Sequence, residues 1–145
     1  MHCDIYRARP ELGAIVHAHP PAATALAITR RSIPPLHYMI VAAGGDDIPC
    51  ADYATFGTAE LSAAVVRALT GRQACLMANH GMLAAGPDLP RALWLAGEVE
   101  ALADYYLRTL TVGGPVLLSA AELAAVRIRF QDYGLRTHAS SAESR

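Results

Sequence analysis

The sequence predicts an α/β fold, in which helices rich in alanine and leucine pack against a sheet of short apolar strands. Short apolar runs that end at turn signals, residues 13–16 and 75–78, are typical of strands. Between residues 59 and 70, and again from residue 88 to 110, apolar residues recur with the period of a helix. With 145 residues, 53% of them apolar, the chain is expected to form one domain with a continuous core.

The first elements follow from proline positions and apolar runs. Residues 1–9 predict the last part of a helix that Pro10 stops, since basic residues near its end suit the helix dipole. Residues 13–16 predict a strand that continues into two histidines and ends at Pro20.

The middle of the chain is less regular. Residues 22–30 are rich in alanine and predict a helix. Residues 33–41 are compatible with a strand or a helix, and both alternatives stay open. Residues 48–51 predict a short strand, in which Pro49 marks an edge or a start.

Two later helices are predicted by their N-terminal signals. Thr58 is a suitable N-cap for a helix that runs to Leu69 and is closed by Gly71. Asp88 starts the longest helix, with Pro90 tolerated in its first turn. The broad apolar surface of that helix predicts burial between layers or between subunits.

The remaining elements are a hairpin and a final helix. The strand that begins at residue 75 ends on a histidine and returns through residues 82–85. Ser119 and Glu122 have the spacing of a capping box and start a helix that we expect to end at Gly134. We assign residues 1–136 to one domain and predict a disordered tail over residues 137–145.

Composition excludes several classes of function. The net charge of −1 and the absence of a basic stripe argue against a nucleic-acid partner. There is no apolar run long enough to span a bilayer and no signal peptide, so we expect no membrane partner and a cytoplasmic location. Cys3, Cys50 and Cys75 are scattered and odd in number, which predicts buried thiols in a reducing compartment.

Histidines at the ends of two predicted strands suggest a metal site. His17 and His19 are two residues apart, so on a strand their side chains point to the same face. His80 ends a second strand and precedes Gly81, which permits a tight turn or a close backbone approach. Taken singly, these are exposed histidines at strand ends or turns. Together, three imidazoles predict a zinc ion with an open fourth position for chemistry.

Several motifs carry a resemblance to a known family. The segment His17-Ala18-His19-Pro20, the turn Asn79-His80-Gly81 and the run over residues 31–40 resemble the class II aldolase/adducin family. Further stretches carry the same likeness, over residues 43–45, 48–51, 53–58, 92–96 and 133–136. The likeness extends from His2 to about Arg136.

The resemblance implies a three-layer α/β/α fold with a mostly antiparallel central sheet, assembled as a homotetramer. It also implies reversible cleavage of a sugar phosphate, L-fuculose 1-phosphate, into dihydroxyacetone phosphate and L-lactaldehyde, with one Zn²⁺ per subunit held by His17, His19 and His80. Zinc over manganese or cobalt is a preference of imidazole ligands. The chain contains no lysine, which excludes a lysine-imine aldolase.

The resemblance further assigns roles to four aromatic residues. It implies that Tyr38, reaching the site of a neighbouring subunit, exchanges a proton with the aldehyde-side oxygen, and that Tyr133 assists. It implies that Phe56 and Phe130 form apolar walls for the lactaldehyde methyl group. From the residues alone, all four would be assigned to ordinary packing.

Members of the family carry a portion that precedes the residue matching Met1, with a phosphate pocket and a glutamate acid/base. We find no match for that glutamate in Glu11, Glu60, Glu98 or Glu100, which are expected to be solvated or to interact with helix dipoles. The resemblance therefore implies an N-terminally truncated domain with impaired turnover. A pentulose-phosphate 4-epimerase and a non-catalytic module for metal binding or oligomerisation remain as alternatives.

Overall fold

The computed structural model describes residues 1–132. Within this part of the chain, the structure contains both helices and strands, in agreement with the α/β prediction. Their order is α1 (His2–Ala8), β1 (Ala14–Ala18), α2 (Pro21–Ile28), the 3₁₀ helix η1 (Tyr38–Ala43), β2 (Cys50–Ala51), α3 (Ala59–Ala68), β3 (Ala74–Met77), β4 (Gly81–Gly86), α4 (Leu89–Leu110) and α5 (Ala120–Asp132). The predicted helix end at Gly134 and the predicted tail over residues 137–145 lie outside the described residues.

The four strands form one sheet in the order β1-β4-β3-β2. β4 is antiparallel to both of its neighbours, and only the short β2 runs parallel to β3. The sheet is therefore mostly antiparallel, as expected. In the β1–β4 register, Ala18 faces Met82, so the end of β1 lies beside the start of β4.

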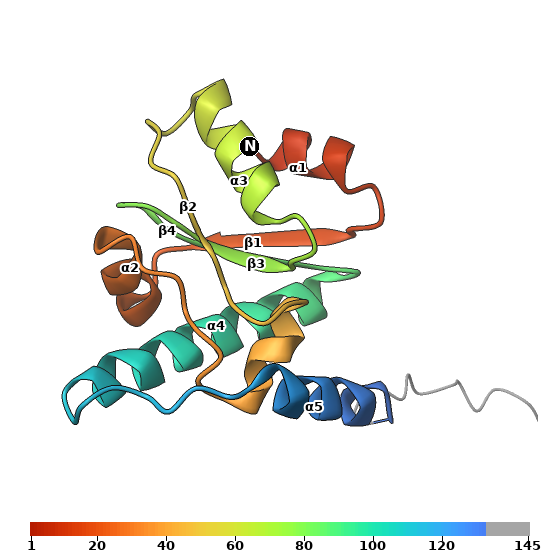
Figure 1. Ribbon diagram of the computed structural model, residues 1–145. Coiled ribbons are helices and arrows are strands. Elements are labelled where there is room, and N and C mark those ends of the chain that lie inside the picture. The colour runs from red at the N-terminus through yellow and green to blue at the C-terminus, as the bar shows by residue number, and fades with distance from the viewer. Residues whose placement is uncertain (133–145) are drawn as a thin grey trace, which may run out of the picture.

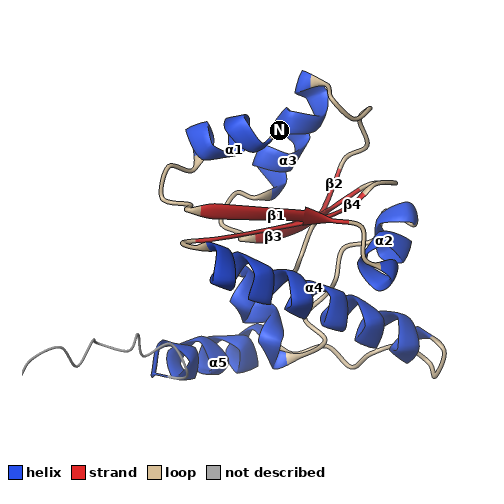
Figure 2. Ribbon diagram, turned by 180° about the vertical axis from the view of Figure 1, so that it is seen from behind, coloured by secondary structure: helices blue, strands red, loops and turns tan. Residues whose placement is uncertain are grey.

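Helices cover both faces of the sheet and complete three layers. Figure 1 shows α1 and α3 on one side of the strands, and α2, α4 and α5 on the other. The reverse view in Figure 2 shows the same division. The predicted three-layer α/β/α fold is confirmed.

Apolar residues alternate between two cores, because successive side chains of a strand point to opposite faces. On β3 and β4, Leu76 and Met82 belong to the core beneath α2 and α4. Their neighbours Cys75 and Leu83 belong to the core beneath α1 and α3. Both strands are buried along their whole length, which explains why their sequences are apolar throughout.

Three predicted helix starts are confirmed by their capping hydrogen bonds. The Thr58 hydroxyl oxygen accepts a bond from the Leu61 N–H at 3.3 Å, and the Asp88 carboxylate accepts one from the Arg91 N–H at 2.8 Å. The Ser119 N–H donates to Glu122 at 2.7 Å, the reciprocal bond of a capping box.

Some boundaries differ from the prediction. The helix expected over residues 22–30 ends at Ile28, because Arg30 adopts a left-handed conformation with φ of 56°. The ambiguous residues 33–41 divide between an isolated β-bridge from Ile33 to Ile48 and the 3₁₀ helix η1. The short strand predicted over residues 48–51 is reduced to Cys50–Ala51.

The cysteine prediction is correct for one thiol and wrong for another. Cys75 is buried in β3, and Cys50 is half-buried. Cys3 is exposed, contrary to the prediction, because it lies on the outer side of α1, whose inward residue is Ile5.

Among residues 1–132, no helix combines the length and apolar character needed to cross a bilayer.

Candidate metal centre

The topology of the sheet brings three histidines to one place. His17 lies in β1 and His19 follows its last residue. His80 lies in the turn between β3 and β4. Because β1 pairs with β4, the end of β1 meets this turn at one end of the sheet.

The three imidazoles are close enough to share one ion. One ligand nitrogen from each ring lies within 4.8 Å of the others. The ring centroids are 4.7 Å apart for His17 and His19, 4.9 Å for His17 and His80, and 5.1 Å for His19 and His80. Nitrogens that bind one zinc at about 2.1 Å lie roughly 3.4 Å apart. Small side-chain rotations therefore suffice to close the site.

The orientation of His17 is fixed by a backbone carbonyl. Its Nδ1 lies 2.9 Å from the Met82 oxygen. A carbonyl oxygen only accepts, so Nδ1 carries the proton and donates, and Nε2 keeps its lone pair for a metal. This contact is the supporting hydrogen bond that metal-binding histidines commonly make.

Gly81 makes room for the second ligand. A Cβ on this residue would lie 2.6 Å from the Ala18 carbonyl oxygen and would overlap the His19 ring. The predicted close approach is confirmed, because the His19 ring and the Ala18 carbonyl oxygen both lie against the backbone of Gly81.

The electrostatics favour a neutral imidazole at His80. Desolvation, followed by the charges of His17 and His19, lowers the pKa of His80 below its ordinary value. The pKa of His2 is also lowered, by desolvation, by His17 and by the amino terminus. Neutral imidazoles are the form that binds metals.

In the described part of the chain, the cluster of candidate metal ligands consists of these three histidines alone, without a carboxylate. A fourth position is therefore left for a water molecule, a substrate oxygen or a further ligand.

A small pocket adjoins His80. It has a volume of about 160 Å³, and its lining includes Tyr53, Phe56 and Asn79. Phe56 is 79% exposed, so its ring is available to a ligand. Of the three aromatic residues assigned by resemblance that lie within residues 1–132, Phe56 is the one that the structure brings beside the histidines.

The other aromatic residues lie elsewhere. Tyr38 is in η1, 50% exposed, and its ring centroid is 6.4 Å from that of Phe130 in α5. Both η1 and α5 lie on the α4 side of the sheet (Figure 1), whereas Ile15, two residues before His17, packs on the α1 and α3 side. Within one chain, these rings do not meet the histidines. Tyr133 lies outside the described residues.

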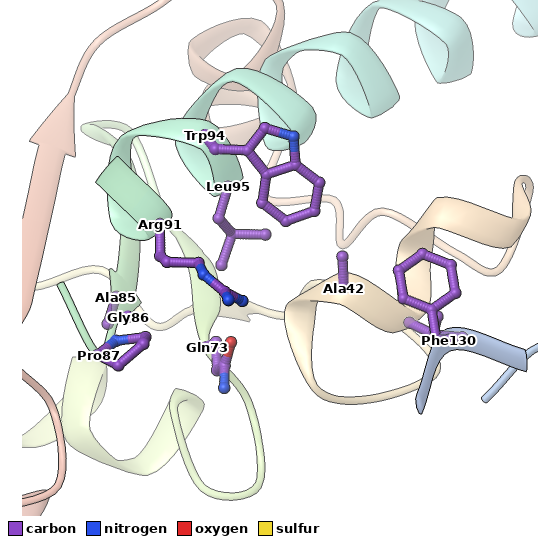
Figure 3. Close-up of a pocket in the computed structure, with 10 residues that line it drawn as sticks. Ala42, Gln73, Ala85, Gly86, Pro87, Arg91, Trp94, Leu95 and Phe130 are labelled. Carbon is purple, nitrogen blue, oxygen red and sulfur yellow. The ribbon is translucent and has the colours of Figure 1, made fainter. Parts of the chain in front are cut away.

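Phe130 instead lines a larger cavity at the other end of β4. Its volume is about 280 Å³, and Figure 3 shows Arg91 and Trp94 of α4 around it, with Gln73 and Pro87. Asn79 and Tyr53 also line the pocket beside His80, and neither was assigned a role from the sequence. A possible signal was present in Asn79, since asparagine is enriched in left-handed turns.

Comparisons with known proteins agree with this geometry. Residues 1–107 match the family described as Class II Aldolase and Adducin N-terminal domain. The chain is 53% identical over 136 residues to the L-fuculose phosphate aldolase of Escherichia coli strain K12. The aligned region covers 93% of this chain and 63% of that protein. It is 50% identical over 133 residues to a 5-methylthioribulose-1-phosphate/5-deoxyribulose-1-phosphate aldolase of Rhodospirillum rubrum, covering 92% of this chain and 60% of that protein.

A solved structure of an L-fuculose 1-phosphate aldolase superposes with a TM-score of 0.85 and 41% identity, over 90% of this chain and 61% of that one. The chain thus spans less than two thirds of the length of these relatives.

Proposed function

The chain belongs to the class II aldolase and adducin family, and on that premise we propose that it carries the metal-binding part of an aldolase that cleaves L-fuculose 1-phosphate. The products are dihydroxyacetone phosphate and L-lactaldehyde. The observation that carries the proposal is the convergence of His17, His19 and His80 within 4.8 Å at one end of the sheet.

In this proposal the three histidines hold one Zn²⁺, with His17 presenting Nε2 because its Nδ1 donates to Met82. A divalent cation bound there supplies positive charge beside the oxygens that become negative when the carbon–carbon bond breaks. Zinc is preferred because three imidazoles with an open position form its usual catalytic ligand set. The chain contains no lysine to carry the charge as an imine.

The remaining roles are proposals of the same kind. Phe56 forms the apolar wall for the lactaldehyde methyl group, which its place beside His80 supports. Tyr38 and Tyr133 hold and release the proton of the aldehyde-side oxygen from a neighbouring subunit, with Phe130 as a second wall. The half-exposed position of Tyr38 beside Phe130 supports a contact across subunits of a homotetramer. The protein acts in the cytoplasm.

No carboxylate among residues 1–132 joins the histidine cluster. We therefore place the general acid/base outside residues 1–132. Loss of such a group typically costs about 100- to 10,000-fold in rate. The 145-residue chain assayed by itself is therefore expected to bind zinc and to turn over slowly.

A second substrate has specific support. Identity to the 5-methylthioribulose-1-phosphate/5-deoxyribulose-1-phosphate aldolase, at 50%, is close to that for the fuculose enzyme. Cleavage of 5-deoxyribulose 1-phosphate would also release dihydroxyacetone phosphate. The preferred substrate is therefore identified by measuring kcat/KM for each of the two and comparing the values.

The test couples released dihydroxyacetone phosphate to NADH oxidation by glycerol-3-phosphate dehydrogenase. We expect metal-dependent turnover of L-fuculose 1-phosphate that a chelator abolishes and Zn²⁺ restores. Turnover that chelation leaves unchanged would contradict the proposal. Interconversion of pentulose phosphates without this product would favour a 4-epimerase, and bound zinc with neither reaction would favour a non-catalytic module.

A further inference from the structure

Asn79 directly precedes the candidate metal ligand His80 and shapes the turn that carries it. This turn, between β3 and β4, is closed by a hydrogen bond from the His80 N–H to the Met77 carbonyl oxygen at 3.0 Å. Asn79 is the third residue of the turn and has a left-handed backbone, with φ of 54°. Residues with a Cβ rarely adopt this conformation, and asparagine tolerates it better than most. The direction in which His80 leaves the turn therefore depends on the backbone of Asn79.

The C-terminal end of α2 holds this turn through hydrogen bonds to Asn79. The Asn79 backbone N–H donates to the Ala27 carbonyl oxygen at 2.9 Å, and its side-chain Nδ2 donates to the Ile28 carbonyl oxygen at 3.4 Å. Its Oδ1 accepts from the Nε of Arg30 at 3.0 Å. A carbonyl oxygen only accepts and an arginine only donates, so the amide can make both side-chain bonds in only one orientation.

Through these bonds, α2 connects the segments that carry two of the three histidines. Its first residue, Pro21, is separated from His19 by one residue. At its other end, the carbonyl groups that bind Asn79 belong to the last turn, where a helix leaves acceptors free. Ala27 in that turn is completely buried, so this end of the helix is anchored in the core. The separation of His19 and His80 is therefore set by α2 as well as by the strands.

The amide of Asn79 is engaged within the protein at both its oxygen and its nitrogen, which suits it to hold the turn. We propose that Asn79 is a positioning residue of the metal centre, which keeps the His80 imidazole directed at the ion by bonding its turn to the end of α2. Asn79 acts through His80 and is not itself a ligand. This inference rests on the proposed function, because it needs the three histidines to hold an ion.

The test uses the 145-residue chain loaded with Co²⁺, whose visible absorption depends on the identity and geometry of its ligands. Titration with Co²⁺ gives the affinity and the spectrum of each variant. Urea unfolding of the metal-free chain measures stability separately. A residue with a purely structural role would change the stability and leave the Co²⁺ affinity and spectrum of the folded chain unaltered.

Two substitutions separate the side chain of Asn79 from its backbone. Asn79→Gly keeps access to positive φ and removes both side-chain hydrogen bonds, whereas Asn79→Ala also disfavours the left-handed conformation. We expect Asn79→Gly to weaken Co²⁺ binding by about three- to tenfold, as for the loss of hydrogen bonds that order the site. Asn79→Ala should weaken it by about ten- to a hundredfold, as for groups that orient metal ligands. Both variants should alter the Co²⁺ spectrum.

The matched control is Thr29→Val, which removes a side-chain hydrogen bond at the same end of α2. The Thr29 hydroxyl donates to the Leu26 carbonyl oxygen at 2.9 Å, so this bond lies within the helix end and not between the helix and the turn. Thr29→Val should lower the stability of the metal-free chain and keep the Co²⁺ affinity and spectrum of the parent chain.

Parental Co²⁺ affinity and spectrum in Asn79→Gly and Asn79→Ala would overturn the inference, as would an equal loss of affinity in Thr29→Val. Asn79→Gly decides the question by itself if Asn79→Ala does not fold. A parent chain that shows no histidine-bound Co²⁺ would instead contradict the proposed function, and the inference with it.

Discussion

The carboxylate of Glu100 in α4 accepts a hydrogen bond from the backbone N–H of Ala22, at 2.8 Å. Its second oxygen accepts from the next N–H, that of Ala23, at the same distance. Both donors belong to the first turn of α2, where free N–H groups and the helix dipole favour a negative charge. The expectation of a helix-dipole partner is confirmed for Glu100. Since α2 starts directly after His19 and Pro20, this contact also fixes the chain beyond the metal centre.

Glu100→Ala should therefore destabilise the protein by about 1–3 kcal/mol, because two N–H donors lose a charged acceptor. Urea unfolding of the metal-free chain measures this change. Glu98→Ala is the control, since Glu98 lies on the same helix without a side-chain partner among the described residues. Equal destabilisation by both variants would show that the Glu100 contact adds nothing.

Each of His17, His19 and His80 should be needed for tight metal binding. Replacing any one by alanine leaves two imidazoles, and we expect zinc affinity to fall by at least about tenfold. Calorimetric titration with Zn²⁺ at neutral pH measures the loss. His37→Ala should bind zinc as the parent chain does, because His37 lies in another part of the fold and its ring accepts from the Met39 N–H.

Gly81→Ala should weaken zinc binding, because the added methyl group overlaps the His19 ring and the Ala18 carbonyl oxygen. The control is Gly97→Ala in α4, where a Cβ meets nothing within 4 Å. That control should stabilise the helix by about 0.5–1 kcal/mol and leave zinc binding intact. Unchanged zinc affinity in Gly81→Ala would mean that His19 is not a ligand.

The start of α5 should depend on pH. The hydrogen bond from the Ser119 hydroxyl, followed by that from its backbone N–H, lowers the pKa of Glu122 below 4.5. A carboxylate with a lowered pKa in the folded state stabilises it above the ordinary pKa, and the contribution disappears as pH falls through the lowered value. Glu122→Gln should therefore reduce the melting temperature at pH 7 and have little effect near pH 3. An equal reduction at both pH values would contradict this assignment.

Thiol reactivity should follow burial. Complete burial raises the pKa of Cys75 to about 12, so this thiol should not react with a disulfide reagent at pH 8 until the protein unfolds. Cys3 is exposed and should react first. Counting reacted thiols in the parent chain and in Cys3→Ser measures the contribution of Cys3. Because Cys50 is half-buried and can account for one reacted thiol, fast labelling of two thiols in Cys3→Ser would show that the strands open.

Local signals in the sequence determined much of the fold. The capping residues Thr58, Asp88 and Ser119 set helix starts because their energetics involve groups within three residues. The expectation that His17 and His19 point to the same face likewise follows from strand geometry alone. These features depend on near neighbours, so one sequence is enough to predict them.

Other features depend on contacts between segments that are far apart in the sequence. The pairing of β1 with β4 sets which end of the sheet carries His80. Nothing within three residues of Arg30 indicates a left-handed turn, and its contact with Asn79 spans 49 residues. Cys3 is exposed for a similar reason, since which side of α1 faces the sheet is set by packing against α3. Local patterns indicated which residues could bind a metal ion. The strand register determined that they meet, because register is a property of paired segments.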